Sequence, residues 1–201
     1  LWINALWVME QLAGELGEDP LPHRMAAERA AGNFRRRFWD PEREYLLDVV
    51  DGPEGDDASL RPNQILAVAL PCGILDEGQS RAVVDCCAWR LLTSYGLRSL
   101  DPDHPDYHPV YRGGVRERDG AYHQGTVWGW LLGPFALAHY RVYGDAALAR
   151  SFLAPLIDHL DDACVGTLGE IFDAEPPHRP RGAFAQAWSV AMVLEAWWVL
   201  G

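Results

Sequence analysis

Six acidic residues in loop segments are the first candidates for chemistry in this sequence: Asp48, Asp51, Asp119, Glu170, Asp173 and Glu175. Two carboxyl groups that flank a glycosidic bond can break it, one acting as acid and the other as base or nucleophile. Glu170 lies within GTLGEIFD at 166–173, where glycines let the backbone approach a ligand closely. We therefore predict that Glu170 is catalytic, with an ordinary surface glutamate as the alternative.

Polar and aromatic residues near this loop and near expected helix starts are candidates for substrate binding. Asp119 either binds a hydroxyl or pairs with Arg118, and the arginines either orient a ligand or form ion pairs. Histidine and tryptophan at these positions either contact a sugar or pack in the core. The binding candidates are Arg61, Asn63, Gln64, Arg98, Asp119, Tyr122, His123, Gln124, Trp128, Gln186 and Trp188.

Several other kinds of chemistry are disfavoured by the sequence. It has no GxSxG, GxxxxGK[ST] or HExxH motif and no CxxC pair, so we predict neither a metal nor a cofactor. The net charge of −12 repels polyanions, which argues against nucleic acid and anionic membranes and is compatible with a neutral substrate. No apolar run approaches the ~20 residues of a membrane span. The four cysteines are expected to be reduced thiols in a cytoplasmic protein.

The elements that must position these residues are predicted to be helices. Segments 1–16, 64–70, 124–140 and 185–200 are apolar on nearly all sides. The more amphipathic segments 23–38, 80–92 and 145–160 alternate with them. Residues 45–50 are expected to be extended, whereas 93–120 and 166–180 are expected to be irregular loops.

A repeat of about 60 residues underlies this alternation. Asn4, Gln64, Gln124 and Gln186 each lie near the start of an apolar helix, and their spacings are 60, 60 and 62 residues. Repeats of this length stack on their neighbours, and a helix that is apolar all round must be buried on every side. A ring of inner helices surrounded by outer helices satisfies both conditions, which predicts an all-α, α/α toroid. Parallel inner helices would bring their polar N-terminal ends together at one mouth of the ring.

Five stretches of the sequence resemble the C-terminal glucosidase region of glycogen-debranching enzymes, the amylo-α-1,6-glucosidase family. They are LWINAL at 1–6, SLRPNQILAVALP at 59–71, LLTSYGLRSL at 91–100, RDGAYHQGTVWGWLLGPF at 118–135 and EIFDAEPPHRPRGAFAQAWSVA at 170–191. They occur in order over essentially the whole chain. The resemblance implies an (α/α)6 toroid and a metal-free, cytoplasmic enzyme that acts with inversion on α-1,6-linked glucose.

The resemblance also implies roles for particular residues. Glu170 matches the general base that activates water, and the binding candidates in the matching motifs are expected to line the pocket. Some positions depart from the family pattern. Ser94 and Gly129 occur where proline is expected, Gly169 where serine is usual, Ala174–Glu175 where Gly–Asp is usual, and Met192 where glutamate is typical.

The general acid of the family is an aspartate expected upstream of Leu1, and four of six inner helices are recognisable here. We therefore expect residues 1–201 to be one domain, the C-terminal part of an incomplete (α/α)6 toroid whose N-terminal part is a further partner. Such a chain alone should not hydrolyse substrate. Its uncovered inner helices should make it poorly soluble.

The resulting prediction is an inverting glycoside hydrolase that removes α-1,6-linked glucose from glycogen or limit-dextrin branch points. Its partner would be glycogen or another α-glucan oligosaccharide. One alternative is another toroid glycosidase, of the glucoamylase or trehalase type. The other is an inactive truncated protein that only binds glucan.

Overall fold

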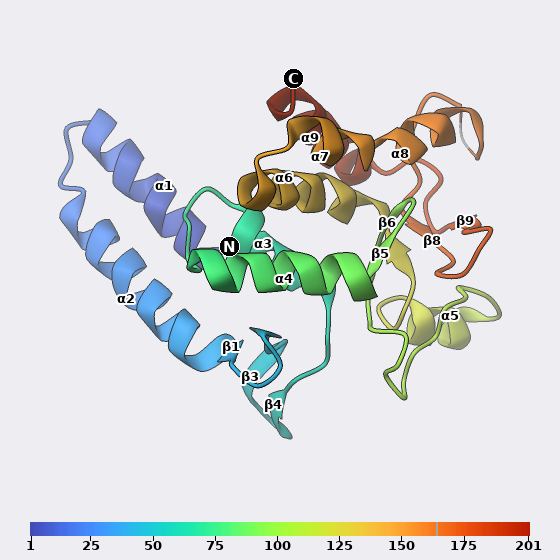
Figure 1. Cartoon of the computed structure of the whole chain (residues 1–201), viewed down its shortest axis with the longest axis horizontal. Helices are drawn as coiled ribbons and strands as arrows, with labels where there is room; N and C mark the ends of the chain where they lie inside the picture. The colour runs from blue at the N-terminus through green and yellow to red at the C-terminus, as the bar shows by residue number, and fades with distance from the viewer. Residues whose placement is uncertain (164) are drawn as a thin grey trace.

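The computed structural model describes residues 1–163 and 165–201, and helices form its framework. An antiparallel pair, α1 (Trp2–Glu15) and α2 (Leu21–Phe38), projects at one end of the molecule (Figure 1). Gly17 follows α1 with a φ of 73°, a left-handed conformation that favours glycine just after a helix. Arg24 donates a 2.7 Å hydrogen bond to Glu10 across this pair.

Helix α6 (Leu132–Tyr143) is the central element of the larger helical layer. Its neighbours are α3 (Leu66–Ala69), α4 (Glu77–Arg90), α7 (Ala146–Ser151) and α9 (Ala187–Val199). In Figure 1, α6 lies between α4 and the C-terminal helix α9. Gly133 permits the close approach of α6 and α9, since a β-carbon there would lie 2.2 Å from the carbonyl oxygen of Met192.

Shorter helices lead into or follow these elements. They are the 3-10 helices η1 (Pro62–Ile65), η2 (Gly129–Leu131) and η3 (His159–Asp161), and the α-helices α5 (Val115–Ala121) and α8 (Ala154–Asp158). Side chains cap several helix starts. Asp76 and Gln79 form a capping box on α4, and Asp145 accepts a hydrogen bond from the N–H of Leu148 at the start of α7.

Nine short strands complete the described fold, and all their pairings are antiparallel. Two hairpins join β1 (Trp39–Asp40) to β2 (Tyr45–Leu46) and β3 (Val49–Gly52) to β4 (Gly55–Asp57). A five-stranded sheet follows the order β5 (Leu92–Thr93), β6 (Gly96–Arg98), β7 (Val127–Trp128), β8 (Ile171–Phe172) and β9 (Pro180–Arg181). This sheet brings segments of the chain from 92 to 181 side by side.

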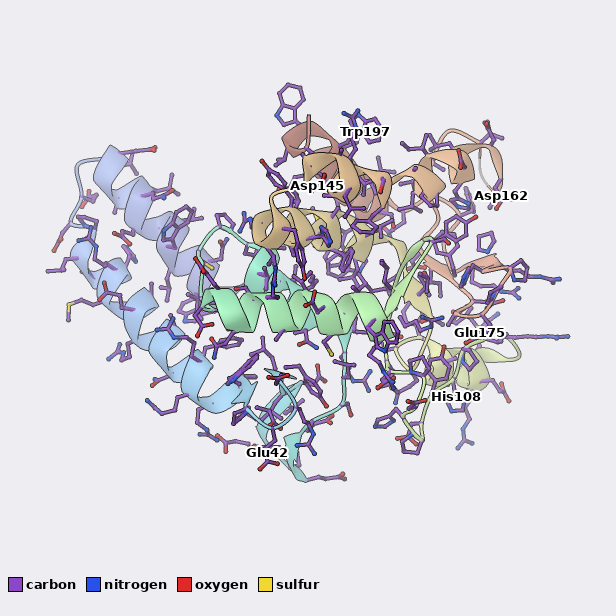
Figure 2. The ribbon with its side chains drawn as sticks, viewed as in Figure 1. Glu42, His108, Asp145, Asp162, Glu175 and Trp197 are labelled. Carbon is purple, nitrogen blue, oxygen red and sulfur yellow. The ribbon has the colours of Figure 1, made fainter. Side chains whose placement is uncertain are left out.

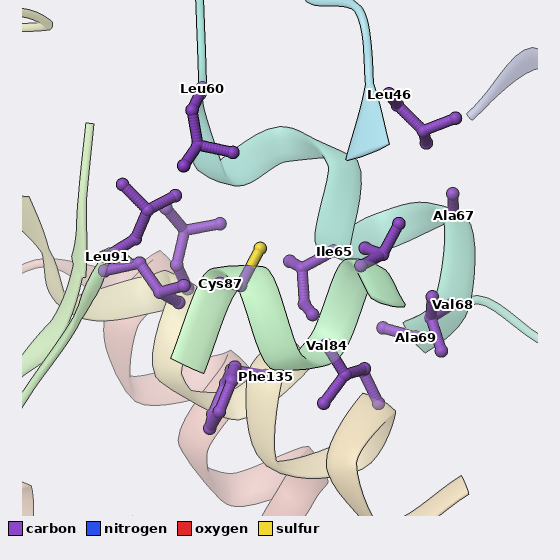
Figure 3. Packing of buried hydrophobic residues seen from close by; sticks show 14 of the residues in the cluster. Leu46, Leu60, Ile65, Ala67, Val68, Ala69, Val84, Cys87, Leu91 and Phe135 are labelled. Carbon is purple, nitrogen blue, oxygen red and sulfur yellow. The ribbon is translucent and has the colours of Figure 1, made fainter. Parts of the chain in front are cut away.

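The hydrophobic core has two parts that meet at α6. In the first, Ile65, Val84, Cys87, Leu91 and Phe135 pack between η1, α4 and α6, all fully buried (Figure 3). In the second, α6 packs on α7, α8 and the sheet through Leu132, Leu153, Leu156 and Phe172, among others.

The thiols within the described residues belong to this framework. Cys72, Cys86 and Cys87 are free, and burial raises the pKa of the Cys87 thiol well above its usual value. Cys164, which the sequence also predicts to be reduced, lies outside the described residues.

The expected helices are present, but several boundaries differ. The helix predicted over 124–140 begins only at η2 and α6, because residues 127 and 128 pair with β6 and β8. The predicted helix at 64–70 is a 3-10 turn followed by the single α-helical turn of α3. The predicted helix at 145–160 is divided into α7, α8 and η3, with Pro155 in the first turn of α8. Of the two predicted irregular loops, the first contains β6 and α5 and the second contains β8.

Candidate active site

The sheet fixes the backbone of Glu170 immediately before β8. The N–H of Glu170 donates to the carbonyl of Ala183 at 3.0 Å, and its own carbonyl accepts from the N–H of Gly129 at 3.2 Å. Gly182 lies directly against the side chain, with a φ of 67°. A β-carbon on Gly182 would be 2.3 Å from Oε2 of Glu170, so only glycine leaves room for this carboxylate.

Both oxygens of the Glu170 carboxylate have hydrogen-bond donors. The hydroxyl of Tyr122 donates to Oε1 at 2.5 Å, and the N–H of Ala183 donates to Oε2 at 2.8 Å. Nε2 of Gln186, the residue that caps α9, lies 3.5 Å from Oε1. These contacts hold the carboxylate in one orientation, and Oε2, which has a single donor, retains a lone pair for a further donor such as water.

Tyr122 is fixed through its backbone as well as through its hydroxyl. Its carbonyl oxygen accepts hydrogen bonds from Thr126 Oγ1 at 2.7 Å and from Trp128 Nε1 at 3.1 Å. Burial raises the pKa of the Tyr122 phenol, and its hydrogen bond to Glu170 raises it further. The phenol is therefore a protonated donor to Glu170 at neutral pH.

Arg61 joins the segment around 61–64 to the segment around 99–124. Nη1 donates to the carbonyls of Ser99 at 3.1 Å and His123 at 2.7 Å, while Nη2 donates to Oε1 of Gln124 at 2.7 Å. Nε lies 3.4 Å from Oδ2 of Asp48. Three of the predicted binding residues, Arg61, His123 and Gln124, are thus brought together.

Gln64 connects this cluster to strand β2. Its Nε2 donates to the carbonyl of Arg61 at 3.0 Å, and its Oε1 accepts from the N–H of Leu46 at 3.2 Å. The Gln64 amide therefore ties β2 to η1, and its hydrogen bonds are made within the protein.

A cavity of about 1850 Å³ lies beside this cluster, between α1, α3, α6 and α9. The predicted residues along its wall are Arg61, Asn63, Gln64, Asp119, His123, Gln124, Trp128 and Trp188. Tyr122, Glu170 and Gln186 adjoin this wall as direct neighbours of His123, Trp128 and Trp188. A large, mostly apolar concavity with a few converging polar groups has the form of a small-molecule site.

Two aromatic stacks form part of the cavity wall. The imidazole of His123 lies parallel to the Trp128 ring at 4.9 Å, and Trp188 stacks on Trp130 at 4.3 Å. Trp130 is buried, whereas Trp188 is 52% exposed and so offers its indole to a ligand. Burial lowers the pKa of His123 and the nearby Arg61 lowers it further, which favours the neutral imidazole.

Arg98, another predicted binding residue, forms hydrogen bonds within the sheet. Its Nη2 donates to the carbonyl of Ala174 at 3.2 Å and its Nη1 to that of Leu92 at 3.4 Å. These bonds connect β6 to the strand β5 and to the residues that follow β8. The geometry supports a role for Arg98 in holding the sheet rather than in contacting a ligand.

The other candidate carboxylates have different surroundings. Buried Asp173 accepts from Arg181 at 2.8 Å and from the N–H of Tyr111 at 2.9 Å, so it ties strand β9 and the loop at Tyr111 to the end of β8. Glu175 accepts from the Tyr107 hydroxyl at 3.2 Å and lies at the sheet end of the molecule (Figure 2). Asp51 pairs with Arg37 at the exposed hairpin.

Two contributors to the site were not predicted from the sequence. The N–H of Ala183 is a backbone donor, which carries no side-chain signal. The role of Gly182 could have been inferred from the sequence, because a glycine near a candidate catalytic loop is compatible with a close backbone approach. Within the described residues, no group of three or more His, Cys, Asp or Glu side chains could hold a metal ion.

The fold is shared with solved glycosidases. Mannosylglycerate hydrolase from Thermus thermophilus, a family 63 glycoside hydrolase solved with glucose, superposes with a TM-score of 0.71 at 23% identity over 98% of this chain. Neutral trehalase from Saccharomyces cerevisiae gives a TM-score of 0.57 at 14% identity over 90% of this chain. The chain spans 45% and 31% of the length of these two proteins. The predicted fold class, an incomplete (α/α)6 toroid, is confirmed by these likenesses.

The fold places the chain in the (α/α)6 toroid class. The amylo-alpha-1,6-glucosidase family model matches residues 1–195, and the chain belongs to that family. The glycogen debranching enzyme of Saccharomyces cerevisiae is 30% identical over 136 residues, which are 55% of this chain and 9% of the yeast enzyme. In the part of the chain that the structure describes, no helix is both long and apolar enough to cross a bilayer.

Proposed function

We propose that this chain contributes the general-base side of the active site in an inverting glycosidase that removes α-1,6-linked glucose from glycogen or limit-dextrin branch points. The observation that carries the proposal is the Glu170 carboxylate, held by Tyr122 and Ala183 next to an aromatic-walled cavity. Membership of the amylo-alpha-1,6-glucosidase family and the partial likeness to the yeast debranching enzyme support the choice of linkage.

In the proposed reaction, Glu170 takes a proton from water as that water attacks the anomeric carbon. The bond from the anomeric carbon to the 6-oxygen of the branching glucose breaks, and a general acid returns a proton to that oxygen. The acid is the aspartate expected upstream of residue 1, and in an inverting pair the two carboxyl groups lie roughly 6.5–9.5 Å apart. The product is β-glucose because water enters opposite to the leaving group.

The charges of the chain support a neutral glucan as the partner. The net charge of −12 disfavours polyanionic ligands, and the exposed Trp188 face suits a sugar ring. We also propose a cytoplasmic location, which agrees with the free thiols of Cys72, Cys86 and Cys87.

A linkage panel tests this function. The protein containing this chain and its native upstream residues is incubated with an α-1,6-glucosyl-branched maltooligosaccharide, maltose, trehalose and mannosylglycerate, and released sugar is measured. Selective release of glucose from the branched substrate is the expected result. Selective cleavage of maltose, trehalose or mannosylglycerate would replace the proposed linkage with another, and binding of the glucan without any turnover would indicate a non-catalytic protein.

A further inference from the structure

Asp48 is a carboxylate on the cavity wall whose hydrogen-bonding capacity is largely unused. It lies between β2 and β3, and its backbone N–H donates to the carbonyl of Asp57 at 2.9 Å. The side chain is 26% exposed and lines the cavity near Arg61 and His123. The fold therefore fixes the Asp48 backbone and leaves the carboxylate directed at the cavity region.

The nearby arginine only partly satisfies this carboxylate. Nε of Arg61 lies 3.4 Å from Oδ2 of Asp48, long for a charge-assisted hydrogen bond of about 2.7–2.9 Å. Both terminal nitrogens of Arg61 donate to other acceptors, the carbonyls of Ser99 and His123 and the side chain of Gln124. Arg61 thus compensates the charge of Asp48 without saturating its oxygens.

This arrangement favours a ligand that donates hydrogen bonds. Burial raises the pKa of the Asp48 carboxyl, while Arg61 opposes that shift. A partly buried carboxylate gains most from donors that do not bring in negative charge, and sugar hydroxyls meet that requirement. An anionic ligand would be repelled by Asp48, and the terminal N–H groups of Arg61 that could attract it are already engaged.

We infer that Asp48 is a substrate-binding residue that accepts hydrogen bonds from hydroxyls of the neutral glucan, with Arg61 as the residue that positions it. This inference rests on the proposed function and names a further specificity determinant in the same cavity. The interaction forms in the ground state and persists in the transition state, so its loss acts on KM more than on kcat.

The experiment uses the protein with its native upstream residues and compares wild type, Asp48→Asn and Glu54→Gln. Asparagine keeps the size of the side chain but removes the charge, and Arg61 retains its bonds to Ser99, His123 and Gln124. Glu54→Gln removes one charge from the exposed turn between β3 and β4 of the same hairpin, away from the cavity wall. It is therefore the matched control for net charge.

Steady-state kinetics are measured with the α-1,6-glucosyl-branched substrate and with its monodeoxy analogues at the terminal glucose and the branching residue. For Asp48→Asn we expect KM to rise roughly 10- to 100-fold with kcat changed by about twofold or less. One deoxy analogue should bind wild type more weakly and bind Asp48→Asn with little further loss, since both changes remove the same charge-assisted hydrogen bond. Glu54→Gln should keep the wild-type KM.

An unchanged KM in Asp48→Asn, or equal losses for every deoxy analogue in both proteins, would overturn the role of Asp48. The latter pattern is what a purely structural Asp48–Arg61 pair predicts. Wild-type turnover separates this failure from a failure of the proposed function. A wild-type protein that releases no glucose contradicts the proposed function itself. Normal wild-type turnover together with an unchanged KM in Asp48→Asn contradicts only the role of Asp48.

Discussion

Tyr122 and Glu170 form a short contact in the candidate active site, with 2.5 Å between the phenolic oxygen and Oε1. The raised pKa of the Tyr122 phenol keeps its proton in place, so Tyr122 orients the carboxylate and does not exchange a proton with it at neutral pH. In the proposed reaction this contact determines which lone pair of Glu170 faces the attacking water. Tyr122 is therefore best described as a positioning residue for Glu170.

Tyr122→Phe is predicted to lower kcat roughly 10- to 100-fold with little change in KM, because a hydrogen bond to a charged group is lost while the ring remains. Steady-state kinetics on the branched substrate measure this. The control is Tyr111→Phe, which changes the neighbouring ring 5.6 Å away. A rise in KM with an unchanged kcat would instead make Tyr122 a binding residue.

At the scale of the elements, the sheet explains why the candidate residues meet. Strand β8 follows Glu170 directly, β7 pairs with it on one side and β9 on the other. Tyr122 precedes β7, and Ala183 follows β9 by two residues. The antiparallel register of β8 and β9 thus places the base and its backbone donor at the same end of these two strands. Tyr122 precedes the opposite end of β7 and reaches Glu170 through its side chain.

The sequence indicated the helices of this framework but not the sheet. Apolar faces at 1–16, 23–38, 80–92 and 185–200 predicted helices that are present with shifted ends. Strands β5 to β9 contain two or three residues each, too few for an alternating pattern to stand out. Glu170 could be proposed as a candidate from the sequence, since glycines and an apolar helix flank it, whereas the contact with Ala183 depends on the register of β9.

Gly169, next to the candidate base, lies beside a buried imidazole nitrogen that lacks a hydrogen-bond partner among the described residues. Nε2 of buried His159 has no hydrogen-bond partner among the described residues, while Nδ1 lies 3.3 Å from Oδ2 of Asp162. A β-carbon on Gly169 would be 3.4 Å from that Nε2, an ordinary van der Waals distance. A serine hydroxyl at 169 could therefore reach the imidazole.

Gly169→Ser is predicted to raise the free energy of unfolding by about 1 kcal/mol more than Gly169→Ala, because serine adds the missing hydrogen bond. Both substitutions restrict the unfolded chain to a similar degree, so alanine is the matched control. Chemical denaturation of the two variants measures the difference. Equal stability of the serine and alanine variants would show that the hydroxyl does not satisfy His159.

At the scale of the whole molecule, the helices at the two ends of the chain expose apolar faces. On α1, Trp2 is 70% exposed and Met9 45%, and on α9 Trp198 is 86% exposed. Trp197, labelled at the rim in Figure 2, is partly covered by the guanidinium of Arg150 at 3.8 Å from its ring. The cavity opens between α1 and α9, and the solved toroids that this chain resembles are more than twice as long.

Residues 1–201 alone are predicted to self-associate and to bind a hydrophobic dye strongly, because patches of this kind favour association. Sedimentation velocity and dye fluorescence measure both effects. Addition of the native upstream residues should reduce dye binding and give a discrete species. Equal dye binding with and without those residues would mean that they do not cover α1 and α9.

The assignment of Glu170 as the general base is tested most directly by the stereochemistry and rate of glucose release. The protein with its native upstream residues is given the branched maltooligosaccharide in an NMR tube, with Glu170→Gln in parallel and Glu175→Gln as the control. We expect β-glucose as the first product of wild type and Glu175→Gln. For Glu170→Gln we expect substrate binding with kcat reduced at least roughly 1,000-fold, beyond the range of a lost hydrogen bond. Initial release of α-glucose, or substantial turnover by Glu170→Gln, would show that Glu170 is not the general base of an inverting enzyme.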